Sequence, residues 1–195
     1  MKTFNCLNCS DCCVFKHEFE MPLVFPWEAR RISKLCFNNE CVFKPFLVYQ
    51  YGNLNIIVLY RWIIKNKCIF LTNDNTCKIH GEKPLACKIY PLIINLDDNT
   101  LRVSYVCKFV SSNKHLLDNT DPALFFKNEY FNALKTFIFL KIIDEYACNN
   151  KWRKIIINNT SINKLEYIDI DQYIDVYDLM NSIEKSLSKY SEKPS

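Results

Sequence analysis

Phe4-Asn5-Cys6-Leu7-Asn8-Cys9-Ser10-Asp11-Cys12-Cys13 is the stretch around which this chain of 195 residues is organised. Two residues separate each of its first three cysteines, and a fourth cysteine follows directly. Such spacing lets thiolates converge on one ion or cluster from a short irregular loop. A second group lies further along and consists of Cys68, Cys77, Cys87 and Cys107. We therefore predict a fold that closes both groups around metal.

The composition is that of a globular chain with enough apolar residues for a sizeable core. Hydrophobic residues make up 49% of it and charged residues 24%, which favours one ordered domain. The net charge of +4 is too small to argue for a nucleic-acid or membrane partner. Only two glycines are present, which excludes the glycine-rich loops that cradle phosphates in most nucleotide-dependent enzymes.

The chain has eleven cysteines, and the cellular compartment decides whether such cysteines more often form disulfides or hold metal. No apolar signal core precedes Cys6, and no run of about 18 apolar residues could span a membrane. We therefore expect a cytoplasmic protein with no membrane partner. In the cytoplasm disulfides are disfavoured, and clustered cysteines more often hold metal. The alternative is a framework of disulfides, as in some hyperthermophile proteins, although the odd number of cysteines weighs against complete pairing.

Hydrophobic periodicity predicts an α+β fold, with a small cysteine-rich, metal-stapled sheet-and-loop half packed with C-terminal helices. Residues 1–110 would form the cysteine-cluster metal-binding region, and residues 111–195 a helical extension of the same folded unit. Helices are predicted at 26–35, 84–90, 121–148 and 171–187. Strands are predicted in two hairpins, at 46–51 with 54–62 and at 92–96 with 101–106, and 68–71 would continue the sheet.

The two C-terminal helices are expected to be amphipathic. Asp121 is a suitable N-cap for the first, with Pro122 at the first helical position. The apolar stripe of this helix is predicted to contain Leu124, Phe131, Leu134, Ile138, Ile142 and Tyr146. The stripe of the second is predicted to contain Ile174, Tyr177, Leu179, Ile183 and Leu187.

The spacing of the first cysteine group suits two kinds of centre. A tetrahedral zinc site needs four ligands, and Cys6, Cys9 and Cys12 could supply three from one loop. The same spacing recurs in ferredoxin-type iron–sulfur loops, which take a fourth cysteine from elsewhere. Since neighbouring side chains usually point apart, Cys12 and Cys13 could serve two different sites. Alternatively, Cys13 is a small buried core residue.

Together the two groups resemble the CxxCxxCC cysteine-cluster family, whose domain is described as zinc- or iron-chelating. The opening motif of the family matches Cys6, Cys9, Cys12 and Cys13. Its later segments match Cys68, Phe70, Leu71, Cys77, Ile79, Pro84, Cys87, Tyr90, Pro91 and Cys107. The chain departs from the family at Lys83, where arginine usually precedes the proline, and at His80, where tyrosine is common. The resemblance covers roughly residues 4–110 and implies a site for zinc, iron or an iron–sulfur cluster such as [4Fe–4S], built from all eight of these cysteines.

Other candidate ligands are less favoured. The spacing Cys77-x2-His80 is ligand-like, but a packed or hydrogen-bonded histidine is expected where the family has tyrosine. Cys36, Cys41 and Cys148 lie outside the motif. Cys36 and Cys41 could pair with each other, although we expect ordinary core or surface thiols.

A lysine stands next to each cysteine of the second group. These lysines are Lys67, Lys78, Lys88 and Lys108. A site of four thiolates around zinc carries a formal charge of −2, and nearby cations favour the thiolate form. The alternative is a solvated face in a chain rich in lysine.

The functions that follow belong to different classes. A metal-binding protein is the first: a zinc site of four thiolates would be structural, whereas an iron–sulfur cluster would allow electron transfer or redox sensing. Some larger members of the family resemble protein-lysine methylases with an iron–sulfur cluster, which makes an enzyme the second possibility. Lysines interleaved with aromatics, such as Lys88 with Tyr90, would suit a third, a zinc-ribbon-like nucleic-acid or protein adaptor. The sequence names no such partner.

Overall fold

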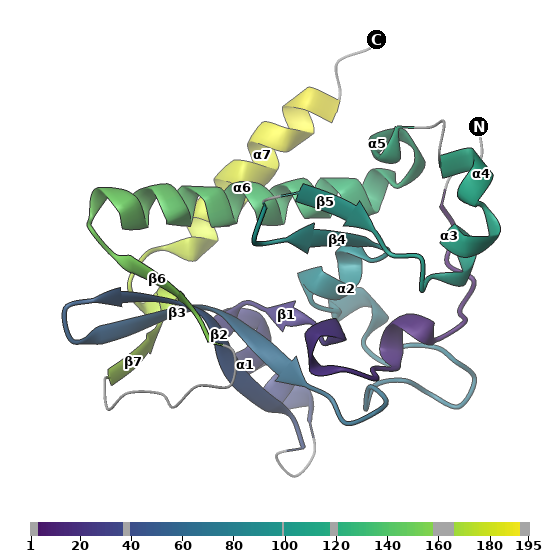
Figure 1. The fold of residues 1–195 in the computed structure, drawn as a ribbon, viewed down its shortest axis with the longest axis horizontal. Coiled ribbons are helices and arrows are strands. Elements are labelled where there is room, and N and C mark those ends of the chain that lie inside the picture. The colour runs from purple at the N-terminus through teal and green to yellow at the C-terminus, as the bar shows by residue number, and fades with distance from the viewer. Residues whose placement is uncertain (1–3, 37–39, 99, 118–120, 158–165, 192–195) are drawn as a thin grey trace. The chain divides into compact units, whose positions relative to one another are not determined.

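The computed structural model describes residues 4–36, 40–98, 100–117, 121–157 and 166–191 (Figure 1). Helices and antiparallel sheets both occur, so the predicted α+β class is confirmed. The chain forms two compact units, each made of two segments. The cysteine unit consists of Met1–Glu20 and Ile64–Phe137, and the sheet unit of Met21–Ile63 and Ile138–Ser195. The expected division into domains near residue 110 stays a prediction.

The sheet unit is built on a five-stranded sheet with the order β1-β3-β2-β6, in which β7 also pairs with β3. The strands are β1 (Leu23–Val24), β2 (Val42–Tyr51), β3 (Leu54–Ile63), β6 (Arg153–Ile156) and β7 (Glu166–Asp169). β2 and β3 form the first predicted hairpin, and the turn places Gly52 at a φ of +56°, which glycine adopts without strain. β1 and β7 pair with opposite ends of β3, antiparallel and parallel respectively.

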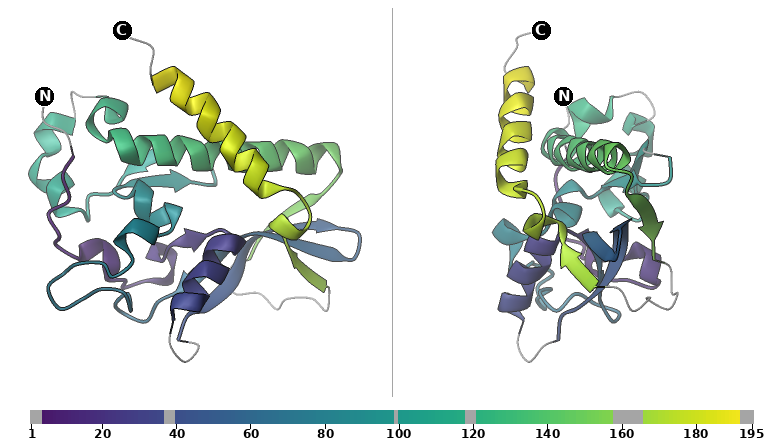
Figure 2. Two further views of the ribbon diagram at one scale, coloured as in Figure 1. Left: turned by 180° about the vertical axis from the view of Figure 1, so that it is seen from behind. Right: turned by 90° about the vertical axis from the view of Figure 1, so that its left-hand side faces the viewer.

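The helices that belong wholly to the sheet unit are α1 (Pro26–Leu35), the short η4 (Ile170–Gln172) and α7 (Val176–Ser191) (Figure 2). α1 has the predicted bounds and packs against β3. Its start is fixed by Glu28, whose carboxylate accepts a hydrogen bond from the Phe25 backbone N–H at 3.1 Å. α7 buries Ile183 as predicted, but Tyr177 is 75% exposed, so its place on the apolar stripe is wrong.

The cysteine unit is made of short elements. They are η1 (Asp11–Cys13), η2 (Glu18–Glu20), η3 (His80–Glu82), α2 (Leu85–Ile89), β4 (Leu92–Asn95), β5 (Thr100–Val103), α3 (Lys108–Ser112), α4 (Lys114–Leu117) and α5 (Pro122–Phe125). β4 and β5 form the second predicted hairpin, which runs beside the first half of the long helix α6 (Lys127–Asn149) (Figures 1 and 2). The strand predicted at 68–71 is wrong. The chain turns there, with the Leu71 N–H donating to the Cys68 carbonyl at 3.1 Å.

The helix predicted at 121–148 is divided. Asp121 caps α5 as expected, accepting a hydrogen bond from the Ala123 N–H at 2.9 Å, but the chain leaves the helix at Phe126 before α6 begins. The predicted apolar stripe also has the wrong phase, because Leu124 and Tyr146 are exposed. The residues of α6 that are buried are Ala133, Thr136, Phe139, Leu140, Ile143 and Ala147. Apolar residues occur on most sides of this helix, so the sequence pattern does not decide which side is buried.

Two of the cysteines outside the motif differ from the expectation of free thiols. A disulfide joins Cys36, which follows α1, to Cys41, which precedes β2. This pairing was the alternative to the expected free thiols. The other nine cysteines are free. The clustered cysteines of the motif are therefore all available as thiols.

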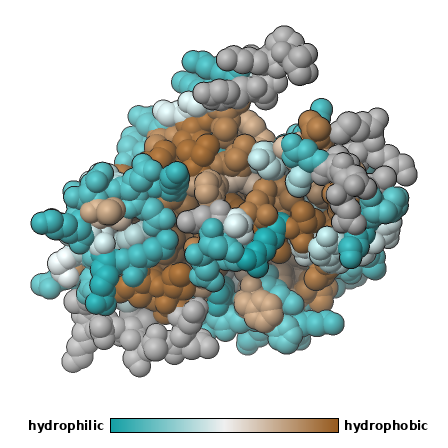
Figure 3. Space-filling view, turned by 45° about the horizontal axis from the view of Figure 1, so that its top comes forward, coloured by the Kyte–Doolittle hydropathy of each residue, from teal (hydrophilic) through white to brown (hydrophobic). Residues whose placement is uncertain are grey.

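The surface of the chain mixes polar and apolar side chains. Figure 3 shows hydrophobic residues, in brown, that reach the surface of one face between polar ones. Among the described helices, none is long and apolar enough to cross a membrane.

Candidate metal centre

All eight cysteines of the two groups belong to the cysteine unit. Cys6, Cys9, Cys12 and Cys13 come from its N-terminal segment, and the other four from its second segment. Forty-three residues of the sheet unit, 21–63, separate the two segments in sequence. The fold therefore brings together thiols that lie far apart along the chain.

The first group is held in a tight loop. Asn8 and Ser10 have positive φ angles, 49° and 64°, a region that asparagine tolerates better than most residues. The Cys13 N–H donates to the Ser10 carbonyl at 2.8 Å, which closes η1. In this helical turn the sulfurs of Cys12 and Cys13 lie 3.9 Å apart. The expectation that these two side chains point apart is therefore wrong, because the helical turn at η1 brings their sulfurs close together.

Backbone pairing joins this loop to the segment of Cys68. The Phe15 N–H donates to the Asn66 carbonyl at 2.7 Å, and the Cys68 N–H donates to the Cys13 carbonyl at 2.8 Å. A single bridge then pairs Leu71 with Cys77. Cys13, Cys68 and Cys77 are thus linked through the main chain and do not depend on side-chain contacts for their placement.

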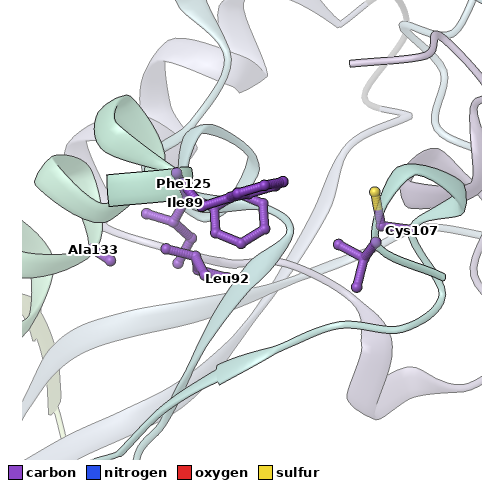
Figure 4. Close-up of a cluster of buried hydrophobic side chains, with 7 residues drawn as sticks. Ile89, Leu92, Cys107, Phe125 and Ala133 are labelled. Carbon is purple, nitrogen blue, oxygen red and sulfur yellow. The ribbon is translucent and has the colours of Figure 1, made fainter. Parts of the chain in front are cut away.

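Cys87 and Cys107 are positioned by short helices. Cys87 lies in α2, and its N–H donates to the Pro84 carbonyl at 2.9 Å. Cys107 precedes α3 and is only 6% exposed, at the edge of a hydrophobic cluster. The other buried members of this cluster are Ile89, Leu92, Val110, Phe125, Phe126 and Ala133. Figure 4 shows Cys107 to one side of the group formed by Ile89, Leu92 and Phe125.

The thiols of the two groups influence one another. The pKa of Cys12 is raised above its ordinary value, first by the hydrogen-bonding contact with Cys13. Burial raises the pKa of Cys68, and the neighbouring Cys77 and Cys12 raise it further. Burial likewise raises the pKa of Cys107, with added contributions from Cys9 and Cys12. Cys12 thus acts on two thiols of the second group, Cys68 and Cys107, and Cys9 acts on Cys107.

Positive charge lies near the same place. The ammonium group of Lys83 acts on Cys12 in the direction that lowers its pKa. Lys108 Nζ lies 3.7 Å from the Asp11 carboxylate, beside Cys107 and Cys12 in sequence. Of the lysines next to the second group, Lys108 thus lies near the first group as well.

The donor set suits zinc or iron by its chemistry. It consists of soft sulfur ligands, partly or fully buried in several cases, and thiolates of this kind select zinc and iron–sulfur centres. As the described side chains stand, however, no three of the His, Cys, Asp and Glu residues are close enough together to hold a metal ion. The predicted assignment of all eight as ligands stays a prediction.

Two other residues of the motif have clear positions. His80 is exposed on η3, so it is not a packed histidine, and the other expectation, of a hydrogen-bonded one, stays a prediction. Tyr90, which the sequence marks only as a motif residue, is half-buried near the cysteines. Burial raises the pKa of its hydroxyl, and Cys107, Cys12 and Cys9 raise it further.

Comparison with known protein families gives a match. Residues 5–108, more than half of the chain, match the family model CxxCxxCC, described as "Putative zinc- or iron-chelating domain". No curated protein and no solved structure matches the chain. All eight cysteines of the two groups lie within the matched residues.

Proposed function

The chain belongs to the CxxCxxCC family, and we propose that it binds zinc or iron through the thiolates of its cysteine unit. The proposed ligands are Cys6, Cys9, Cys12, Cys13, Cys68, Cys77, Cys87 and Cys107. Which of them bind directly, and whether they form one centre or two, depends on the metal.

One observation carries this proposal: the main chain joins the loop of the first cysteine group to the segment of Cys68, because the Cys68 N–H donates to the Cys13 carbonyl at 2.8 Å. The sulfur of Cys13 lies 3.9 Å from that of Cys12. Crowded thiols resist ionisation because each thiolate disfavours the next. A bound cation reverses this balance, since metal coordination deprotonates thiols.

The same donor set supports two kinds of centre. Four thiolates complete a tetrahedral zinc site and leave no open position for water, which would make its role structural. Four thiolates also hold a [4Fe–4S] cluster, which would supply electron transfer or redox sensing. In either case Cys12 and Cys13 would tie the N-terminal loop to the segment of Cys68 through the centre.

We also propose the cytoplasm as the location of the protein. Nine free cysteines in one chain, eight of them clustered, persist as thiols most readily in a reducing compartment. The pair Cys36 and Cys41, which forms a disulfide, lies outside the cluster.

The proposal is tested by comparing Cys12→Ser with Cys148→Ser in the full chain, purified without oxygen. Cys148 is an exposed free cysteine on α6 outside the motif, which makes it the matched control. Elemental analysis is expected to show metal retained by the wild type and by Cys148→Ser, and largely lost from Cys12→Ser. Equal metal content in all three proteins would overturn the proposed role of Cys12. Absence of zinc and iron from the wild type would overturn the proposed function.

A further inference from the structure

Trp152 lies at the centre of a group of tyrosines in the sheet unit. It directly precedes β6 and is only 7% exposed. Four tyrosine rings surround its indole, at 5.1–6.1 Å between ring centroids. They are Tyr49 and Tyr51 of β2, Tyr146 of α6, and Tyr173, which follows η4. Segments that lie far apart in the sequence therefore bring five oxidisable rings together.

The indole N–H of Trp152 has no acceptor among the described residues. Its Nε1 atom is buried and makes no hydrogen bond with any of them. Such a donor is uncommon, since most buried polar groups are paired. Loss of an electron makes an indole N–H strongly acidic, but here no described residue is placed to take the proton. An oxidised indole at this position would keep its positive charge and take an electron from a neighbouring ring.

Tyr49 is the buried member of the group, and it has a base at its hydroxyl. It is 2% exposed, whereas the other three tyrosines are 38–47% exposed. Its hydroxyl donates a hydrogen bond to the Asp144 carboxylate. Lys154 Nζ lies 3.0 and 3.2 Å from the two carboxylate oxygens, and this positive charge favours the ionised form of Asp144. An ionised carboxylate can accept the phenolic proton as an electron leaves the ring.

We propose that Trp152 and Tyr49 form a radical-transfer site, which passes the oxidising equivalent of a one-electron oxidant from the indole to the buried phenol. In the first step the oxidant, a small oxygen- or nitrogen-centred radical, takes one electron from Trp152 and becomes an anion. In the second step one electron moves from Tyr49 to the oxidised indole, which is restored. The phenolic O–H bond breaks as its proton moves to Asp144, leaving a neutral tyrosyl radical. This inference is independent of the proposed metal binding.

The test is pulse radiolysis of the full chain with azide radicals, which oxidise tryptophan in preference to tyrosine at neutral pH. In the wild type, the tryptophan-radical absorption should decay as the tyrosyl-radical absorption grows, at a rate independent of protein concentration. Tyr49→Phe keeps the ring and removes the hydroxyl, so most of this fast growth should be lost. Trp27→Phe is the matched control, because that indole packs on Phe25 and Phe139, which azide radicals do not oxidise. It should leave the fast growth unchanged.

A second variant examines the proton. Asp144→Asn keeps an acceptor for the Tyr49 hydroxyl but cannot take its proton, so the fast growth should be slower. For the wild type it should also be slower in D₂O than in H₂O, because the O–H bond breaks in the same step. A wild type without concentration-independent tyrosyl growth, or Tyr49→Phe with unchanged fast growth, would overturn the inference. Equal rates in Asp144→Asn and the wild type would overturn the role of Asp144 as proton acceptor.

Discussion

The two compact units of this chain differ in what holds them together. The sheet unit has a ten-residue hairpin ladder, flanking strands and a packed helix, with β3 and Phe139 buried in an apolar core. In the cysteine unit none of the helices α2 to α5 exceeds five residues, and the only sheet is β4 with β5 among the described residues. Helices of that length have little stability of their own. The cysteine unit also contains the first part of α6 and the hydrophobic cluster around Leu92 and Phe126, so the comparison predicts that bound metal would add more to the stability of this unit than to that of the sheet unit.

The largest effect is expected from removing the metal. A strong chelator should unfold the cysteine unit and leave the sheet unit folded, because structural zinc contributes on the order of 10 kcal/mol of folding free energy. Hydrogen exchange measures this directly: amides in β4, β5 and α3 would lose protection, while those in β2 and β3 would keep it. Chelator already saturated with zinc is the control. Loss of protection in both units together would contradict the comparison.

Phe139→Ala is expected to have the opposite effect, which is to destabilise the sheet unit and leave the metal content of the cysteine unit unchanged. Phe139 is fully buried and meets the rings of Phe25 and Trp27 edge-on at 5.1 and 5.7 Å between centroids, all within the sheet unit. Its truncation should lower the free energy of unfolding of the sheet unit by about 3–5 kcal/mol in urea. Metal content should not change. Tyr177→Ala, at an exposed position of α7, should leave the stability nearly unaltered.

The sheet unit is also expected to lose stability in alkali. Burial and the hydrogen bond to Asp144 raise the pKa of Tyr49, and burial with the hydrogen bond to Asp169 raises that of Tyr60. Below pH 10 both are neutral in the folded and unfolded states, so the full stability is present. Above it the unfolded state ionises first, and each tyrosine should cost about 1.4 kcal/mol per pH unit until its folded pKa is reached.

Denaturant unfolding between pH 9 and pH 11.5, limits set by the ordinary tyrosine pKa of about 10, measures this slope. Tyr49→Phe should remove the contribution of Tyr49 to this slope, whereas Tyr177→Phe, in the same unit, should leave the slope unchanged. A slope that is the same in all three proteins would show that the environment of Tyr49 does not cause it.

The smallest effect is expected at the start of α5. Asp121 accepts a hydrogen bond from the Ala123 N–H, and Asp121→Ala should lower the stability of the cysteine unit by about 1 kcal/mol. Asp121→Asn keeps an acceptor and should lower it less. Thermal unfolding of the metal-loaded protein would measure both changes. Equal stability of Asp121→Ala and the wild type would show that the cap contributes nothing to the unit.

The elements with local signals could be predicted from sequence, and those that depend on distant contacts could not. Proline at the start of α1 and Gly52-Asn53 between β2 and β3 are such signals, and both elements lie where expected. The buried side of α6 could not be predicted, because Phe137, Ile138 and Phe139 offer apolar residues on different sides. Tertiary packing chose among them.

The candidate centre, too, could be predicted from sequence only in part. Spacing indicated the first four candidate ligands and the family resemblance the other four, and the fold places all eight in one unit. Spacing could not show that the sulfurs of Cys12 and Cys13 lie on the same side, since this depends on the helical turn at η1.

X-ray absorption at the zinc and iron edges of the full chain, purified without oxygen, tests the central claim most directly. The account predicts one of the two metals in a first shell made only of sulfur, at about 2.3 Å for zinc. For an iron–sulfur cluster a second shell of iron would be added. A first shell dominated by nitrogen or oxygen, or neither metal in the protein, would contradict the claim that the thiolates of the cysteine unit hold the metal.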